Sequence, residues 1–464
     1  MLVAGVDSST QSTKVVLCRA EDGTITGRGS APHPPGTESD PADWWAALQR
    51  AGEGLLEQAD AVAVAGQQHG MIVLGEDGEV VRPALLWNDL RSAADAQELV
   101  AQRSPQWWAN ETGTVPNASF TVTKLHWLAR REPEHAARTA SVMLPHDWLT
   151  WRLGASEPTT DRGDASGTGY FSPATGQWLP GLADAVLGHP VRLPKVARPA
   201  EIVGQTPWGA ALAAGTGDNM AAALGLGLAP GEVATSIGTS GTAFAVSEVP
   251  AADPAGNVAG FADATGRFLP LVCTVNAGLV LSSVAAMIGT DVAGLTERAL
   301  AAQPGAGGLT LLPYFDGERT PDRPAATGTL TGLTTRNATG ENLARAAVEA
   351  VLTSLASVAG LLTGYGVECK SVLLIGGAAR SEAIRSAAPG IFGVPVDVPD
   401  PEEYVALGAA RQAAWALAGT AEPPQWPRRA VQRYEGSPQP GLLERFGVLR
   451  DATAIWEEEE GTRP

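Results

Sequence analysis

The chain contains the same pattern twice: a short apolar strand, a turn rich in hydroxyl side chains, and a second strand. The first copy spans residues 2–18 and turns at Asp7 to Thr13. The second copy spans residues 232–246 and turns at Gly238 to Gly241. Each copy predicts a β-hairpin, and a repeated supersecondary unit strongly limits the folds that the chain can adopt.

Other parts of the two halves also correspond. The apolar run 60–65 ends in Gly66-Gln67-Gln68-His69-Gly70, and the run 371–375 ends in a second glycine-rich segment, 376–381. The length of 464 residues suits two domains. We therefore predict a duplicated α/β fold, with one domain at residues 1–226 and the other at residues 227–464.

Hydroxyl groups and backbone N–H groups in such turns could bind phosphate. Taken alone, the turn Asp7 to Thr13 is equally well explained as an ordinary polar hairpin turn. Two similar turns that face each other across a cleft would hold the phosphates of a nucleotide from both sides. The repetition therefore favours nucleotide binding.

Composition excludes several other classes of protein. With 32 Lys and Arg against 50 Asp and Glu, the formal net charge is −18, which argues against a nucleic-acid surface. An acidic protein that binds a polyanion must supply backbone N–H groups or a metal ion. The first six residues lack the basic region of a signal peptide. The uncharged stretch 268–290 is interrupted by polar residues and proline, so we expect a strand and a helix there rather than a membrane span. The three cysteines form no CxxC pattern, so we expect a reducing compartment, which for this chain is the cytoplasm. We also expect a monomer or homodimer without a membrane partner.

The stretch Gly215 to Ala223 places one carboxylate, Asp218, where an alanine-rich helix is expected to begin. The helix dipole favours the ionised form of an acid at that position. An ionised Asp beside glycines can approach a ligand closely and act as a general base. The alternative is a plain N-cap, which is the commoner use of Asp before a helix.

Helical spacing of apolar residues predicts helices at 40–57, 120–131 and 342–363. The segment 159–168 is expected to be a long polar loop. The tail from about residue 418 is rich in proline and arginine and then acidic, and it is expected to wrap the surface or to fray.

With these motifs in view, the chain resembles the FGGY sugar kinases from residue 2 to about residue 417. The turn Asp7 to Lys14 resembles the family's first phosphate loop, with Ser9 in place of its glycine. Residues 237–241 fit the second phosphate loop, 376–381 resemble the adenosine motif, and 328–349 fit the C-terminal signature. Residues 119–131 nearly fit the N-terminal signature.

The resemblance implies a fold and a reaction. The family belongs to the actin/Hsp70/hexokinase-like ATPases, which have two ribonuclease H-like α/β domains and an interdomain cleft. Three segments, 66–70, Trp87-Asn88-Asp89 and 317–321, are most similar to the family members that phosphorylate D-xylulose. The resemblance therefore implies an enzyme that uses ATP, Mg²⁺ and D-xylulose.

The resemblance also implies roles for individual residues. Asp218 corresponds to the catalytic base, and Asp7 to the carboxylate that holds magnesium through water, with Asp218 beside the same ion. The implied sugar-binding residues are Gln68, His69, Trp87, Asp218 and Asn219. The implied nucleotide-binding residues are Thr10, Thr13, Lys14, Gly238, Thr239, Gly376, Gly377 and Ala378.

Several of these assignments have simple alternatives. His69 could be a satisfied core histidine, Lys14 a solvated charge, and Trp87 one of many core or surface tryptophans. Another sugar or polyol, such as ribulose, gluconate or glycerol, could be the substrate. Glycerol kinases carry an Arg-Glu pair where this chain has Gln68-His69, which counts against glycerol. An ATPase without sugar chemistry, acting on a protein partner, is the alternative of a different class.

Overall fold

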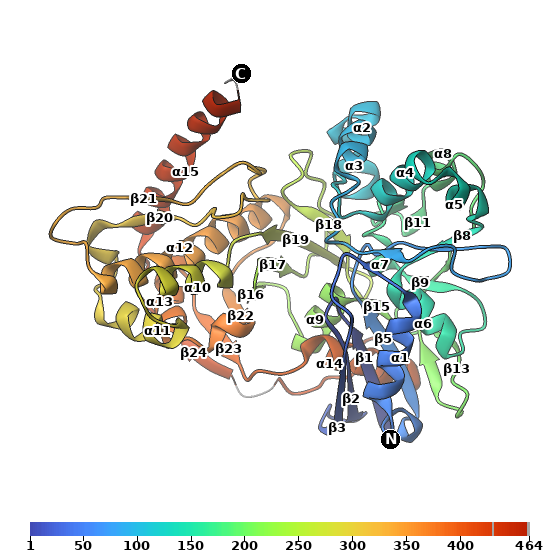
Figure 1. The fold of residues 1–464 in the computed structure, drawn as a ribbon. Coiled ribbons are helices and arrows are strands. Elements are labelled where there is room, and N and C mark those ends of the chain that lie inside the picture. Colours follow the sequence, from blue (N-terminus) through green and yellow to red (C-terminus); the bar gives the residue numbers. More distant parts are fainter. Residues whose placement is uncertain (429–430, 462–464) are drawn as a thin grey trace. The chain divides into compact units, whose positions relative to one another are not determined.

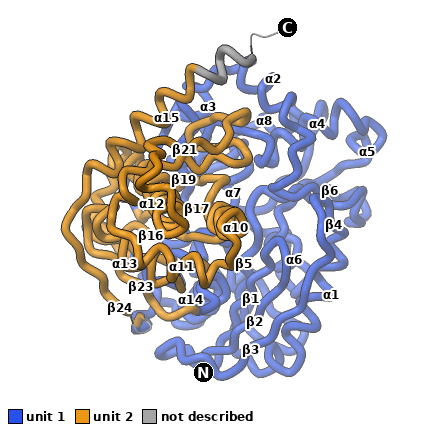
Figure 2. Tube along the Cα trace, turned by 60° about the vertical axis from the view of Figure 1, so that its left-hand side comes forward, with its two compact units in different colours: residues 1–228, 247–269, 402–427 blue, residues 229–246, 270–401, 428–464 orange. Residues whose placement is uncertain are grey.

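The computed structural model describes residues 1–428 and 431–461, with residues 456–461 described by their backbone (Figure 1). Their contacts form two compact units (Figure 2). The first unit comprises Met1–Leu228, Ser247–Leu269 and Glu402–Pro427. The second comprises Ala229–Val246, Pro270–Pro401 and the C-terminal part from Arg428.

A mixed sheet forms the centre of the first unit. Its strands lie in the order β13-β14-β5-β1-β2-β3, and β15 also pairs with β5. These strands are β1 (Leu2–Ser8), β2 (Ser12–Arg19), β3 (Ile25–Pro32), β5 (Ala61–Gly66), β13 (Ile202–Gln205), β14 (Ala211–Ala213) and β15 (Thr216–Gly217). β1 is antiparallel to β2 and parallel to β5, so the predicted first hairpin is present.

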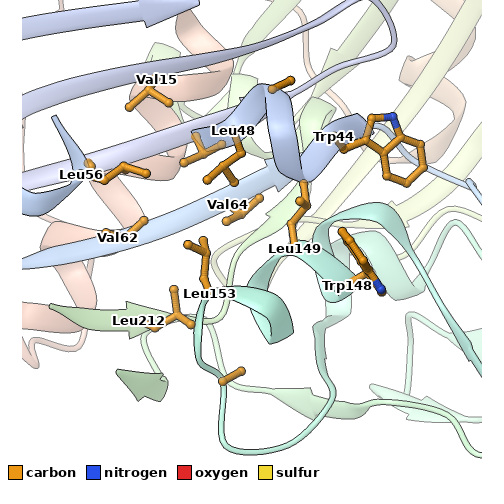
Figure 3. Packing of buried hydrophobic residues seen from close by; sticks show 14 of the residues in the cluster. Val15, Trp44, Leu48, Leu56, Val62, Val64, Trp148, Leu149, Leu153 and Leu212 are labelled. Carbon is orange, nitrogen blue, oxygen red and sulfur yellow. The ribbon is translucent and has the colours of Figure 1, made fainter. Parts of the chain in front are cut away.

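Helices cover both faces of this sheet. On one face, α1 (Pro41–Gly52) and α6 (Pro145–Leu153) contribute Leu48 and Leu149 to a core shared with Val62 and Val64 of β5 (Figure 3). On the other face, α14 (Tyr404–Ala418) lies directly on β1. A Cβ atom on Gly5 would lie only 1.9 Å from the carbonyl oxygen of Ala406, so glycine at this position allows the close approach.

The remaining elements of the first unit surround these layers. The helices are α2 (Ala93–Arg103), α3 (Pro105–Thr112), α4 (Thr121–Arg131), α5 (Pro133–Arg138), α7 (Arg162–Ala165), α8 (Leu182–Leu187), α9 (Asp218–Leu226) and the 3-10 turn Leu56–Gln58. The short strand pairs are β4 (Glu38–Ser39) with β7 (Ala84–Leu85), β6 (Ile72–Leu74) with β8 (Ser141–Met143), β9 (Thr159–Asp161) with β12 (Lys195–Ala197), and β10 (Phe171–Ser172) with β11 (Gln177–Trp178).

The second unit has its own sheet, with strands in the order β19-β17-β16-β22-β23-β24. These strands are β16 (Glu232–Ile237), β17 (Gly241–Ala245), β19 (Phe268–Thr274), β22 (Ser371–Ile375), β23 (Val396–Pro399) and β24 (Val431–Tyr434). A separate antiparallel pair is formed by β20 (Thr310–Leu312) and β21 (Thr329–Thr331). The chain also forms strand β18 (Ala259–Ala262). The helices are α10 (Gly278–Met287), α11 (Val292–Ala301), α12 (Gly340–Leu361), α13 (Glu382–Phe392), α15 (Pro440–Gly461) and the 3-10 turns Ala306–Gly308, Leu362–Tyr365 and Gly377–Arg380.

The two sheets share one arrangement. In each, the first strand of the hairpin is antiparallel to the second and parallel to a later strand: β1 with β2 and β5, and β16 with β17 and β22. The prediction of two α/β domains with the same order of parts is therefore confirmed. The functional boundary at residues 226/227 stays a prediction.

Two predictions were wrong. The segment 159–168 is not a plain loop, because it forms β9 and α7, and Asp161 caps α7 by accepting hydrogen bonds from the backbone N–H groups of Gly163 and Asp164. The tail lies largely at the surface around β24, but it does not merely wrap the surface. β24 pairs with β23, and Phe446 of α15 lies in a buried cluster with Leu312 and Tyr314.

Helix α12 is long and apolar enough to cross a bilayer by composition, but 72% of its most apolar window is buried inside the protein. This degree of burial is typical of a core helix. The stretch 268–290 forms β19 and α10, as predicted.

Candidate active site

The topology of the first unit brings three chemical segments to one edge of its sheet. β1 and β5 run parallel, and so do β15 and β5. The carboxyl ends of parallel strands meet at the same edge, where α/β proteins bind ligands. Asp7 lies at the end of β1, Gln68 and His69 follow β5, and Asp218 follows β15.

Asp7 is buried, and burial raises its pKa to about 6, although the Ser9 hydroxyl and Lys14 oppose this shift. Ser9 Oγ donates a hydrogen bond to Asp7 Oδ1. Lys14 lies opposite Asp7 in the hairpin, and its Nζ forms an ion pair with Glu403 at 2.6 Å. A carboxylate that is buried and incompletely neutralised suits a nearby cation.

Thr10 and Thr13 differ in their surroundings. The Trp87 indole Nε1 donates a hydrogen bond to Thr10 Oγ1 at 2.8 Å. This bond anchors the Trp87 side chain, which is 37% exposed. Thr13 Oγ1 lies 2.8 Å from Nε2 of His33 in the interior. Thr10 and Trp87 are thus brought together at the site, whereas the Thr13 hydroxyl is engaged with His33.

His69 is held in a special conformation. Its φ of 69° is in the left-handed region, which non-glycine residues seldom adopt. Its Nδ1 lies 2.6 Å from the Gly167 carbonyl oxygen, so Nδ1 carries the proton and donates it. The ring packs against Phe120 and Phe261, with centroid distances of 4.6 and 5.8 Å. This strained and fixed placement is typical of a functional residue.

Asp218 is the first residue of α9, and the N-cap position belongs to Gly217. Its Oδ1 accepts hydrogen bonds from the backbone N–H and the side-chain amide of Asn219, at 2.8 and 2.9 Å. Asn219 also donates to Gln68 Oε1 at 2.9 Å. Burial raises the pKa of Asp218 to about 8, and the charges of Asp7 and Asp164 add to the shift.

The geometry around Asp218 argues against the plain N-cap interpretation. An N-cap side chain accepts hydrogen bonds from the N–H groups two or three residues later. In the part of the chain that the structure describes, the side-chain carboxylate of Asp218 instead accepts hydrogen bonds from Asn219, the next residue. Its carboxylate is instead surrounded by other acids and by the sugar-site candidates Gln68 and Asn219.

Sequence reasoning missed a buried cluster beneath these residues. His146 Nδ1 lies 2.6 Å from Asp164 Oδ2 and 3.3 Å from Asp147 Oδ1, and all three side chains are fully or almost fully buried. Burial alone would lower the pKa of His146, but the surrounding carboxylates raise it to about 9. The only sequence signal for this cluster is the density of acids in 147–164, which also occurs on ordinary surfaces.

The nitrogen and oxygen atoms of this cluster lie within 4.8 Å of one another, which is close enough for all three side chains to bind one metal ion. However, the distance of 2.6 Å between nitrogen and oxygen suits a direct hydrogen bond. We therefore interpret it as an ion pair. The oxygen atoms of Asp7 and Asp218 remain the better candidates for a hard cation such as Mg²⁺.

The second unit presents two exposed backbone segments at one edge of its own sheet. Gly238 and Thr239 follow β16, and Gly376, Gly377 and Ala378 follow its parallel neighbour β22. Gly376 has a φ of 93°, and a Cβ there would lie 2.6 Å from the Ile237 carbonyl oxygen. Nothing lies within 4 Å of a Cβ built on Gly377, so a ligand can approach this backbone closely.

Comparison with known proteins gives consistent results for sequence and structure. Residues 2–227 match the N-terminal domain of the FGGY family of carbohydrate kinases, and residues 233–417 match its C-terminal domain. A xylulose kinase of Streptomyces coelicolor is 45% identical, and the match covers 100% of this chain and 98% of that protein. The xylulose kinase of Streptomyces rubiginosus is 44% identical over 99% of this chain and 98% of its own.

Solved structures show the same likeness. The crystal structure of xylulose kinase from Bifidobacterium adolescentis has a TM-score of 0.90 and 43% identity, and the match covers 97% of this chain and 99% of that one.

Proposed function

The chain belongs to the FGGY family of carbohydrate kinases, and from this premise we propose that it transfers the γ-phosphoryl group of ATP to D-xylulose. The products are ADP and D-xylulose 5-phosphate. The full-length similarity to xylulose kinases of two Streptomyces species supports this choice of sugar.

The arrangement around Asp218 is the observation that supports the reaction most directly. A phosphoryl transfer to a sugar needs a base that accepts the proton of the attacking hydroxyl. Burial raises the pKa of Asp218 to about 8, which makes its carboxylate a stronger base than an exposed Asp. We assign this proton transfer to Asp218.

Other residues of the first unit are proposed to bind and orient the sugar. Gln68 and Asn219 form a hydrogen-bonded pair beside Asp218. His69 is fixed by Gly167 and two phenylalanine rings, and Trp87 offers a partly exposed indole face. Together they provide donors, an acceptor and an aromatic surface, which is the set of groups that a polyol requires.

The nucleotide is proposed to use both backbone turns. Thr10, Thr13 and Lys14 belong to the first turn, although Thr13 and Lys14 already have partners in His33 and Glu403. Gly238, Thr239, Gly376, Gly377 and Ala378 belong to the exposed segments of the second unit. We accordingly propose functional domains at residues 1–226 and 227–464.

We propose that Asp7 and Asp218 hold Mg²⁺, and their buried, mutually repelling carboxylates fit a divalent cation. When bound, Mg²⁺ would neutralise charge on the triphosphate. We further propose that the enzyme works in the cytoplasm as a monomer or homodimer, which agrees with the absence of disulfides among its three cysteines, all of them described.

A coupled assay of ADP release tests the proposal. D-xylulose is expected to give the highest kcat/KM in a panel that also contains ribulose, gluconate and glycerol. A higher value for gluconate or glycerol would contradict the assigned substrate. ATP turnover that no sugar stimulates would contradict the sugar kinase reaction itself and favour an ATPase with a protein partner.

A further inference from the structure

Two buried side chains beside Gly217 each carry a polar atom that has no hydrogen-bond partner among the residues that the structure describes. These atoms are Asp164 Oδ1 and Gln68 Nε2. Asp164 is 0% exposed and Gln68 is 4% exposed. A Cβ built on Gly217 would lie 3.0 Å from Gln68 Cγ and 3.2 Å from Asp164 Oδ1. Both side chains therefore flank the residue that directly precedes Asp218.

The two atoms have complementary hydrogen-bonding roles. A carboxylate oxygen accepts, and an amide nitrogen donates. Buried polar groups in native proteins nearly always have partners, so each exception calls for an explanation such as a ligand group. A hydroxyl is the simplest group that satisfies both atoms, because its hydrogen can go to Asp164 while its oxygen accepts from Gln68.

The rest of Asp164 is already fixed by its neighbours. Its Oδ2 is bound by His146 Nδ1 at 2.6 Å, and its backbone N–H donates to Asp161 Oδ1 at 2.9 Å. The first contact fixes the side chain and the second fixes the backbone, which leaves Oδ1 as the carboxylate oxygen available to another group. His146 thus has a positioning role, since its Nδ1 sets the orientation of the Asp164 carboxylate.

The same short segment also reaches a second sugar-site candidate. Asp164 and Gly167 lie three residues apart, and the Gly167 carbonyl oxygen accepts from His69 Nδ1. One turn of chain therefore places an acceptor beside Gln68 and fixes the ring of His69. This arrangement links the segment 159–168 to Gln68 and His69, the two candidates that follow β5.

We propose that Asp164 is a further sugar-binding residue, whose Oδ1 accepts a hydrogen bond from one non-reacting hydroxyl of the pentulose while Gln68 Nε2 donates to the same hydroxyl. The inference rests on the proposed sugar kinase function. The hydroxyl differs from the phosphorylated one, which Asp218 is proposed to deprotonate. Asp164 and Gln68 would thereby discriminate sugars by the position and configuration of that hydroxyl.

Asp164→Asn tests this role with the 1-, 3- and 4-deoxy analogues of D-xylulose. In the wild type, one analogue is expected to lose about 10- to 100-fold in kcat/KM, the usual range for a hydrogen bond to a charged group. Asp164→Asn is expected to lose a similar factor with D-xylulose. With that one analogue, the kcat/KM of Asp164→Asn should be almost the same as its kcat/KM with D-xylulose. The KM for ATP should stay unchanged.

Asp147→Asn is the matched control, because it neutralises a neighbouring buried acid of the same cluster. It should keep the wild-type penalty for every analogue. If Asp164→Asn does not fold, as judged by circular dichroism, Gln68→Met removes the donor and should abolish the same single penalty. A folded Asp164→Asn or Gln68→Met protein that still shows the full wild-type penalty for that analogue would overturn the inference.

The substrate assignment and the role proposed for Asp164 are tested separately. If the wild type phosphorylates a sugar other than D-xylulose, the substrate assignment is wrong. The same comparison with deoxy analogues of the true sugar then decides the role of Asp164.

Discussion

At the scale of single residues, substitution of Asp218 is expected to have the largest effect on kcat. Asp218→Asn keeps the size of the side chain and its contact with Asn219, but an amide cannot accept the proton of the sugar. Loss of a general base typically lowers the rate about 10²- to 10⁴-fold. We expect a folded protein that binds ATP and has a kcat reduced by that factor, measured by coupled ADP release and nucleotide titration.

The N-cap interpretation makes a different prediction for the same variant. Asn caps a helix about as well as Asp, so activity and stability would both remain near those of the wild type. A kcat within a few-fold of the wild type would therefore remove Asp218 from the reaction.

His69 gives the second prediction at this scale. His69→Ala removes a side chain whose orientation is set by the Gly167 carbonyl oxygen. Loss of one buried contact to a sugar hydroxyl is expected to cost about 1–3 kcal/mol in kcat/KM for D-xylulose. The affinity for ATP should change little. His135→Ala is the control, since His135 pairs with Glu132 at a more exposed position of α5, and an equal loss there would contradict the assignment.

Short motifs made Asp7, Asp218 and the pair Gln68-His69 candidates, because Asp7 stands where an apolar segment meets a run of hydroxyl residues and the others stand beside glycines. Asp164 and His146 could not be found in the same way. Their relation depends on a contact between residues 18 positions apart, and no local pattern distinguishes a buried Asp from a solvated one. The site residues as a group stay predictions until variants are measured.

At the scale of secondary-structure elements, the position of Asp218 depends on how closely α9 approaches α14. A Cβ on Gly408 would lie 1.8 Å from the Ala221 carbonyl oxygen, and one on Gly225 would lie 2.0 Å from that of Tyr404. Glycines on both helices thus allow backbone contact. Because α9 begins at Asp218, a shift of this helix would also move the carboxylate.

Gly408→Ala is therefore expected to affect both stability and activity. Overpacking of a tight contact typically costs about 1–3 kcal/mol, which urea denaturation would detect, and kcat should fall with it. Gly360→Ala is the matched control on α12, where nothing lies within 4 Å of the added Cβ. That substitution should be neutral or slightly stabilising because alanine favours helix. A Gly408→Ala protein as stable as the wild type would contradict the close packing.

Helix positions were predicted well where caps were clear. The helix predicted at 40–57 is α1, and Asp40 accepts from the N–H of Ala42. The helix predicted at 342–363 is α12, which Thr339 caps. By contrast, the tail could not be placed, since its pairing with β23 and its packing on Leu312 involve residues distant in sequence.

At the scale of the whole molecule, the repeated hairpins predicted the duplicated α/β fold, and the resemblance of the ordered motifs predicted the family; both are confirmed. The assignment of Ser247–Leu269 and Glu402–Pro427 to the first unit was not predictable. Each segment follows the second hairpin in sequence, and an apolar segment carries no local mark of the core that it joins. Phe261, which packs on His69, shows that such a segment can contribute to the candidate site.

The first unit buries several acids, and this predicts how the stability of the ligand-free protein depends on pH. Burial raises the pKa of Asp7 to about 6 and that of Asp218 to about 8. Both acids ionise near pH 4 in the unfolded chain. A raised folded-state pKa contributes stability that is fully present below the unfolded pKa and is lost as the pH rises through the folded pKa. The free energy of unfolding should therefore fall between pH 5 and 7.

Asp218→Asn isolates one contribution to this dependence. Between pH 5 and 7, native Asp218 is largely protonated and unfolded Asp218 is ionised, so its removal should flatten the curve by up to about 1 kcal/mol per pH unit. Urea denaturation at several pH values measures the slopes of the two proteins. The repulsion expected from the net charge of −18 acts in the same direction, but added salt screens exposed charges much more than buried ones. A difference between the two slopes that persists in high salt would therefore come from the buried carboxylate, whereas equal slopes would show that Asp218 is ionised in the free protein.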